Sequence, residues 1–146
     1  MATYTADAVA LLGYLVDALP READRLFAEA EAGETVVRAP STALAEVLYS
    51  VSRDKNVRGV ALTGTPEEAR QALVGNGPVS VAPVGDAELV EYVQVVAEYS
   101  IRDALIVASH RAEDTDAIIT TDSVIGDADY ETIWEGLAVP GFLSRE

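Results

Sequence analysis

The stretch that most constrains the fold runs from Ser100 to Asp122, with the sequence SIRDALIVASHRAEDTDAIITTD. Ser100 is a typical helix N-cap, Asp103 follows three residues later as in a capping box, and apolar residues then recur at helical spacing. The segment 117–120 is short, apolar and β-branched, which is typical of a buried strand in a parallel sheet. The stretch therefore predicts a helix followed by a buried parallel strand.

This order of elements places two carboxylates at one edge of the predicted sheet. Helices that connect parallel strands run antiparallel to them, so the first turn of such a helix lies at the carboxyl ends of the strands. Asp103 belongs to a first helical turn, and Asp122 directly follows a strand. We therefore expect Asp103 and Asp122 to lie close together.

The rest of the chain alternates between strand and helix patterns without a repeat, linker or low-complexity tract. It predicts an α/β fold with a single domain over residues 1–146: a three-layer α/β/α sandwich on a central five-stranded, mostly parallel sheet. The expected strands are Thr3–Ala6, Thr35–Arg38, Val79–Val84, Ala117–Thr120 and Leu137–Val139. The expected helices are Ala8–Leu19, Arg21–Ala32, a helix opened by Pro40, one capped by Thr65, Ala87–Glu98 and one capped by Ser100. A loop is expected over Ser123–Tyr130.

The charge is strongly acidic: 25 Asp and Glu stand against 10 basic residues, a net charge of −15, and Lys55 is the single lysine. This is the wrong sign for a nucleic-acid binder in low salt, because phosphate contacts rely on Lys and Arg. An acid-rich, lysine-poor chain resembles halophilic proteins, which work in salt where the Debye length falls to about 3 Å at 1 M. In such salt, net charge does not exclude nucleic acid as a substrate.

Other classes are less compatible with the composition. No apolar run approaches the roughly 20 residues of a membrane-spanning helix, and the N-terminus lacks the layout of a signal peptide. The chain has no cysteine, which excludes disulfides and thiolate metal ligands. We expect a soluble, cytoplasmic protein without a membrane partner.

Two further acidic residues are expected at the same edge of the sheet. Asp7 follows the first expected strand, and Glu46 lies early in the helix opened by Pro40, so both belong to the edge of Asp103 and Asp122. Two charges 4 Å apart repel by about 4 kcal/mol at an effective dielectric constant of 20, so such a cluster needs compensation. Oxygen ligands without cysteine favour a hard cation, Mg²⁺ or Mn²⁺, over zinc.

Each of these carboxylates also has a purely structural interpretation. Asp7 could cap the first helix, Asp103 could serve only the capping box, and Asp122 could form a turn after its strand. Glu46 lies off the apolar stripe of its helix and could be a surface charge. His110, in the second half of its helix, is expected to be structural or exposed.

The motifs TADAVALLGYL with Asp7, PSTALAEVL with Glu46, SIRDALIVA with Asp103 and DAIITTD with Asp122 together resemble the PIN domain, in particular the VapC-type toxins of toxin–antitoxin pairs. The resemblance spans nearly the whole chain. It implies an α/β/α sandwich and a Mg²⁺- or Mn²⁺-dependent endoribonuclease that hydrolyses RNA. It also implies a homodimer that an antitoxin silences.

Carried over to this sequence, the resemblance assigns Asp7, Glu46, Asp103 and Asp122 to the acidic quartet that holds metal, and Thr121 to a supporting polar position. Two departures stand out. Val9 occupies a place where the family usually has Ser, Thr or Asn, and the segment after Asp122 is longer than usual and contains Asp127 and Asp129. Possible substrate contacts are Arg53, Lys55, Arg58 and Arg102, although ion pairs on an acidic surface explain these residues equally well.

Two rival functions remain open from the sequence. A receiver-like signalling domain also gathers acidic residues at this edge, but it needs a lysine at the end of the last strand, and Lys55 is far from that position. The second rival is a catalytically silent PIN-like module that binds RNA or protein. Tyr14 and Leu15 are expected to leave apolar area for a partner chain to cover.

Overall fold

The computed structural model describes residues 1–121, 123–126 and 130–134. The strands are β1 (Ala2–Ala6), β2 (Thr35–Pro40), β3 (Asn56–Val57), β4 (Val60–Ala61), β5 (Val79–Ala82), β6 (Ala117–Ile119) and β7 (Thr132–Ile133). The α-helices are α1 (Ala8–Leu15), α2 (Arg21–Glu31), α3 (Ser41–Ser52), α4 (Pro66–Arg70), α5 (Asp86–Val95), α6 (Ile101–Glu113) and α7 (Ser123–Gly126). A π-helical turn, Gln71–Gly75, extends α4.

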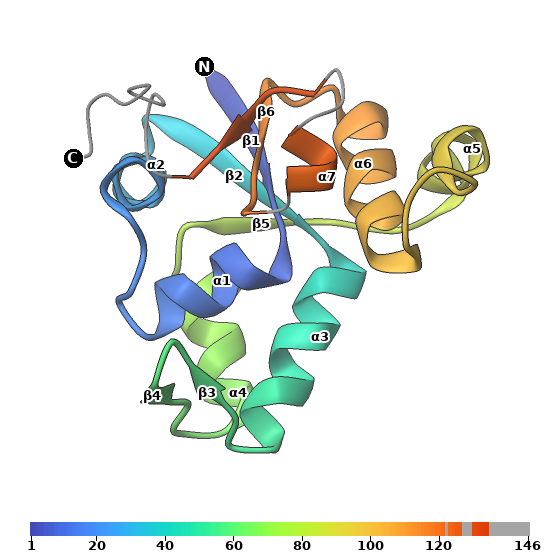
Figure 1. The fold of residues 1–146 in the computed structure, drawn as a ribbon. Helices are drawn as coiled ribbons and strands as arrows, with labels where there is room; N and C mark the ends of the chain where they lie inside the picture. Colours follow the sequence, from blue (N-terminus) through green and yellow to red (C-terminus); the bar gives the residue numbers. More distant parts are fainter. Residues whose placement is uncertain (122, 127–129, 135–146) are drawn as a thin grey trace.

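The central sheet has five parallel strands in the order β5-β2-β1-β6-β7. Helices flank it on both sides: α2 packs against β2 on one side, and α6 packs against β1 and β2 on the other (Figure 1). The predicted α/β sandwich with a five-stranded sheet is therefore confirmed. In chain order the strands run 3-2-1-4-5, whereas receiver-like folds follow 2-1-3-4-5, so the structure excludes the receiver alternative.

The core lies between the sheet and these helices. All three residues of β6 are buried, as the continuous apolar pattern predicts for a strand covered on both faces. Phe27 of α2 is fully buried, and Tyr14 of α1 stacks on it with ring centroids 5.0 Å apart. These contacts hold α1 beside α2.

Several predicted boundaries were wrong. The first helix ends at Leu15 instead of Leu19, because Asp17 adopts a left-handed conformation with φ of 55° that a helix cannot contain. The loop expected from Ser123 begins with the short helix α7, whose Ile125 is fully buried and anchors it to the core. The strand expected at Leu137–Val139 lies outside the described residues, and the fifth strand of the sheet is β7.

The hairpin formed by β3 and β4 was also missed. Its two-residue turn, Arg58 and Gly59, has φ values of 52° and 81°. Two positive φ values in succession are typical of a type I′ turn, which usually carries Asn-Gly or Asp-Gly. An arginine at the first position gave no such signal.

His110 has the structural role expected of it. Its Nδ1 lies 2.7 Å from the Thr115 hydroxyl, which in turn lies 2.8 Å from the buried hydroxyl of Thr5. Burial lowers the pKa of His110 below its usual value, so the neutral ring is favoured. The network ties α6 to β1.

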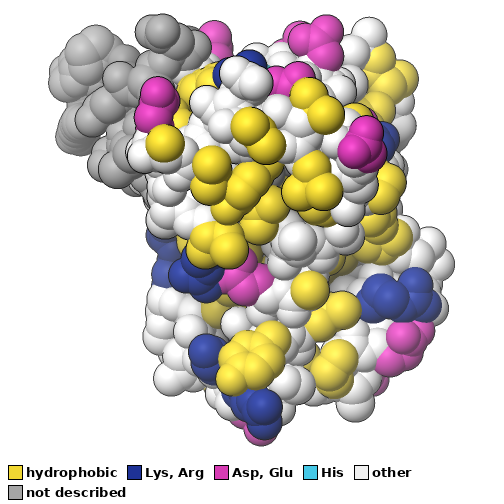
Figure 2. Space-filling model, turned by 90° about the vertical axis from the view of Figure 1, so that its right-hand side faces the viewer, with side chains coloured by type: hydrophobic (Ala, Val, Ile, Leu, Met, Phe, Trp, Pro, Cys, Tyr) yellow, Lys and Arg dark blue, Asp and Glu magenta, His cyan; other side chains and the backbone are white. Residues whose placement is uncertain are grey.

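The exposed apolar surface differs from the expectation. Tyr14 and Leu15 are half-buried against the core. Large apolar side chains are instead exposed on and beside α5, namely Leu89, Val90, Val93, Val96 and Ile101. Figure 2 shows hydrophobic side chains gathered on the upper part of this face. Within the described residues, no helix is both long and apolar enough to cross a membrane.

Candidate functional site

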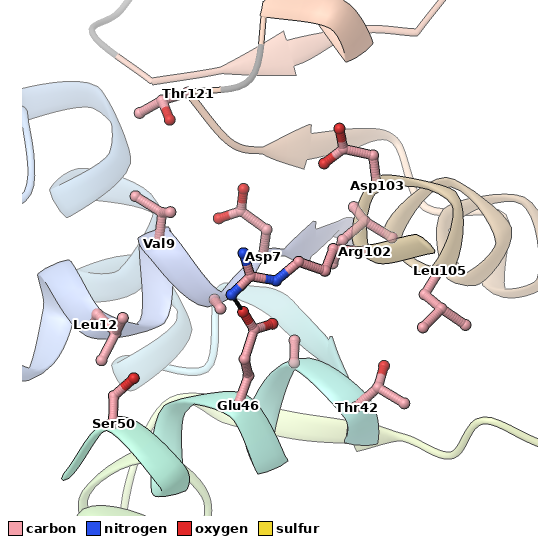
Figure 3. A pocket seen from close by; sticks show the side chains of 13 residues that line it. Asp7, Val9, Leu12, Thr42, Glu46, Ser50, Arg102, Asp103, Leu105 and Thr121 are labelled. Carbon is pink, nitrogen blue, oxygen red and sulfur yellow. Dashed lines mark ion pairs between the residues drawn. The ribbon is translucent and has the colours of Figure 1, made fainter. Parts of the chain in front are cut away.

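A pocket of about 290 Å³ opens at the carboxyl ends of β1 and β6, where the strand order reverses direction (Figure 3). In open α/β sheets, such switch points are the usual place for ligands because the adjoining loops separate there. Residues of α1, α3, α6 and the segment after β6 line the pocket, among them Asp7, Glu46, Arg102, Asp103 and Thr121. Three of the four expected carboxylates thus reach one cavity from three different elements.

Asp7 joins the end of β1 to the start of α1. Its Oδ1 accepts a hydrogen bond from the backbone N–H of Ala10 at 2.9 Å, so Asp7 is the N-cap of α1. Its Oδ2 accepts a hydrogen bond from the Thr120 hydroxyl at 2.5 Å. Asp7 therefore caps α1, as one of its two interpretations predicted, and it also lines the pocket. Both positions follow from its place at the turn from β1 to α1.

Thr120 was missed as a site residue because a threonine beside apolar residues was interpreted only as a strand former. Its side chain is almost fully buried, at 2 % exposure, and it holds the Asp7 carboxylate in place. Val9, which has no hydrogen-bonding side chain, lines the same pocket. The signal in the sequence was a hydroxyl at the carboxyl end of the strand next to β1, where it can reach Asp7.

Glu46 projects from the second turn of α3 into the pocket. Its carboxylate forms an ion pair with Arg102, which comes from the first turn of α6 on the opposite wall (Figure 3). The sequence left two interpretations of Arg102 open, a substrate contact and an ion pair on an acidic surface. The structure shows the ion pair, and the Arg102 side chain also lines the pocket. The pair is solvent-exposed, with 73 % of the Arg102 side chain accessible, so its net stabilisation is small.

Asp103 lies beside Arg102 in the first turn of α6, with its carboxylate at the pocket (Figure 3). The Ser100 hydroxyl accepts a hydrogen bond from the backbone N–H of Asp103 at 3.2 Å, which fixes the start of the helix. Thr121 lines the pocket as well. Asp122, Asp127 and Asp129 lie outside the described residues.

The donor set agrees in chemistry with a hard divalent cation. The pocket offers the carboxylates of Asp7, Glu46 and Asp103 and no sulfur, while His110 lies near the far end of α6. In the described part of the chain, however, no three Asp, Glu, His or Cys side chains are grouped closely enough to hold an ion. Glu46 faces Arg102 in this arrangement, so an ion shared with Asp7 would have to compete with that guanidinium.

The remaining predicted substrate contacts are not part of the pocket lining. Arg53 and Lys55 lie over the ring of Tyr49, with the Arg53 Cζ at 4.9 Å and the Lys55 Nζ at 5.2 Å from its centroid. Arg58 lies over the ring of Trp134 at 5.2 Å. None of the three lines the pocket.

Comparison with known proteins identifies the fold. A chain of VapBC2 from Rickettsia felis, determined with a DNA fragment of its promoter, superposes with a TM-score of 0.66 at 15 % identity. VapC20 of Mycobacterium tuberculosis, a toxin that cleaves the sarcin–ricin loop, superposes with a TM-score of 0.62 at 20 % identity. In both cases 90 % of this chain and 98 % of the other chain are covered.

The chain has the PIN-domain fold of the VapC toxins. No protein-family model and no curated protein matches the sequence. The likeness to the VapC toxins therefore lies in the arrangement of the helices and strands.

The hydrogen bond from Thr120 to Asp7 gives a direct test of the site geometry. Replacing Thr120 with Val removes the hydroxyl and keeps the shape, so the free energy of unfolding should fall by about 1.5 kcal/mol, the lower end for a hydrogen bond to a charged group. Thr120→Ser, which keeps the hydroxyl, is the control and should lose less. Equal unfolding free energies for wild type and Thr120→Val, from urea titrations, would show that Asp7 does not depend on this contact.

Proposed function

We propose that this chain is a Mg²⁺- or Mn²⁺-dependent endoribonuclease of the VapC type, the toxin of a toxin–antitoxin pair. The observation that carries the proposal is the convergence of Asp7, Glu46 and Asp103 on one pocket at the switch point of a VapC fold. Asp122, two residues after Thr120, would complete the quartet. One structural neighbour is itself a toxin that cleaves RNA at the sarcin–ricin loop.

In the proposed mechanism, Asp7, Asp103 and Asp122 would hold the cation, and Glu46 would bind it directly or through water. A bound divalent ion would lower the pKa of a coordinated water and offset the charge of the phosphate. The chain itself positions the ligands: Thr120 and the Ala10 N–H fix the Asp7 carboxylate, and Ser100 fixes the helical turn that carries Asp103. A carboxylate that is not ligating can accept the proton of the attacking water.

Covalent catalysis has little support. The chain has no cysteine, and the Nδ1 of its single histidine lies against Thr115, at the edge opposite the pocket. A Ser–His or Cys–His nucleophile is therefore not assembled at this site. Direct hydrolysis by water remains the route that the residues support.

Arg102 has two roles in this proposal. Before substrate binds, its guanidinium neutralises Glu46 across the pocket. If Glu46 were a ligand of a bound cation, its carboxylate would no longer pair with Arg102, and the planar guanidinium of Arg102 would be well suited to a phosphate oxygen of the RNA. Its position in the pocket makes it the strongest substrate contact among the predicted basic residues.

The proposed partners are RNA, an antitoxin protein and a second copy of the chain. One structural neighbour is a chain of the VapBC2 complex, which was determined with a fragment of promoter DNA. That this neighbour belongs to a complex supports a protein partner for the present chain. The exposed apolar side chains of α5 offer an area that a homodimer would cover.

A catalytically silent PIN-like module is the second candidate. The observation in its favour is that no three of the described carboxylates form a group able to hold an ion, and that Arg102 faces Glu46. The two candidates differ in whether RNA cleavage depends on Asp103.

Cleavage of a structured RNA tests the proposed function. Wild type should cleave in Mg²⁺, and Asp103→Asn should lower the rate by orders of magnitude because it removes a carboxylate from the proposed metal site. With a net charge of −15, cleavage should first rise with KCl as repulsion is screened, and fall only at higher salt.

Equal residual cleavage by wild type and Asp103→Asn at every salt concentration would assign the activity to another site or a contaminant. Circular dichroism of both chains checks that the substitution leaves the fold intact.

Arg102 provides a test of cation binding that does not depend on cleavage. Arg102→Gln frees Glu46 and removes a positive charge, so Mg²⁺ should bind about two- to fivefold more tightly, the effect expected of an exposed ion pair. The affinity follows from the rise in melting temperature with Mg²⁺ at constant ionic strength. Arg111→Gln is the matched control, because Arg111 pairs with Glu91 near the other end of the same helix. Weaker Mg²⁺ binding by Arg102→Gln would refute the competition between Arg102 and the cation.

A further inference from the structure

The basic residues of this acidic chain fall into two groups. Five of those described, Arg25, Arg38, Arg70, Arg102 and Arg111, form ion pairs with carboxylates. In the described part of the chain, Arg21, Arg53, Lys55 and Arg58 form none, and the last three lie over aromatic rings instead. In a chain with 25 acidic residues, a local group of cations without carboxylate partners is an exception.

Two of these three cations, Arg53 and Lys55, lie over the same ring, that of Tyr49. Its side chain is 53 % exposed although its phenol ring could bury a large apolar area. Arg53 follows it by one helical turn, and Lys55 lies just beyond the end of α3. Together the three side chains form an exposed aromatic ring with two positive charges over it.

This group lies next to the pocket. Tyr49 follows Glu46 by three residues on α3, and its immediate neighbour Ser50 lines the pocket (Figure 3). Residues three apart on a helix are neighbours on its surface, so Tyr49 stands one turn from a proposed catalytic carboxylate. A ligand that extends from the pocket along α3 would meet its ring.

An exposed aromatic ring with two cations close to it has the chemistry of a site for single-stranded nucleic acid. Unpaired bases stack on aromatic side chains whatever their sequence, and Arg or Lys contacts the adjoining phosphates. A contact between the ring and the aliphatic stems of Arg53 and Lys55 would explain the geometry without a ligand. That explanation does not account for two cations that have no carboxylate partner among the described residues of an acidic chain.

We infer that Tyr49, Arg53 and Lys55 form a subsite that binds one unpaired nucleotide of an RNA beside the pocket. The ring stacks on the base, and the two cations contact the flanking phosphates. The inference rests on the proposed function in taking RNA as the ligand, but it concerns binding and not cleavage. It predicts that the chain prefers substrates with an unpaired nucleotide next to the scissile bond.

The test measures binding of a short, labelled, unstructured RNA by fluorescence anisotropy, with every chain carrying Asp103→Asn so that the RNA stays intact. Tyr49→Ala should weaken binding by about 5- to 100-fold, the effect of losing one stacked base. Tyr49→Phe keeps the ring and should bind within about twofold of the parent. Val81→Ala, which alters an exposed apolar side chain on the edge strand β5, is the matched control and should bind like the parent.

Two further arms separate stacking from charge. Arg53→Gln combined with Lys55→Gln should reduce the slope of log affinity against log salt by about 1.4, because each phosphate contact on a single strand contributes about 0.7. With fully paired duplex RNA, Tyr49→Ala should bind like the parent, since no base is free to stack.

The inference is overturned if Tyr49→Ala binds the unstructured RNA as tightly as the parent, if Tyr49→Phe loses as much as Tyr49→Ala, or if no chain binds the RNA. Failure of the proposed function is a separate result. Ring-dependent binding without cleavage by the chain that retains Asp103 would keep the subsite and refute the nuclease, whereas cleavage without ring dependence would refute the subsite alone.

Discussion

The structure depends on how like charges are held together at one edge of a parallel sheet. Asp7, Glu46 and Asp103 line one small pocket, and like charges that are brought together at a partly buried site repel one another. The chain offsets this repulsion with local positive potential. Asp7 and Asp103 lie at the N-termini of α1 and α6, where the helix dipole favours negative charge, and Arg102 neutralises Glu46.

The edge itself could be predicted from the sequence because it follows from chain direction alone. Asp7 directly after a strand and Asp103 in a first helical turn must meet in a parallel sheet, and Ser100 marks where that turn begins. The pairing of Arg102 with Glu46 could not be predicted, because it depends on the separation of α3 and α6 across the pocket. Thr120 was hidden for a similar reason, since its hydroxyl acts on a residue 113 positions away.

In the peripheral elements, the structure differs from what the sequence pattern predicts. A helix pattern continued past Leu15, but the left-handed backbone at Asp17 ends α1 and turns the chain toward α2. The hairpin at Arg58 and Gly59 had no typical turn sequence, and its position became evident only from the backbone. These differences leave the pocket unchanged, because its walls come from the carboxyl ends of β1 and β6 and from α1, α3 and α6.

A crystal structure with bound Mn²⁺ tests the central claim most directly, because the anomalous signal of manganese locates the ion independently of any activity. The account predicts an ion in the pocket, coordinated by carboxylate oxygens of Asp7 and Asp103, with Glu46 turned from Arg102 toward it. Manganese bound only at other acidic surface positions, with the Arg102–Glu46 pair intact, would contradict the claim that this edge of the sheet is a metal-dependent catalytic site.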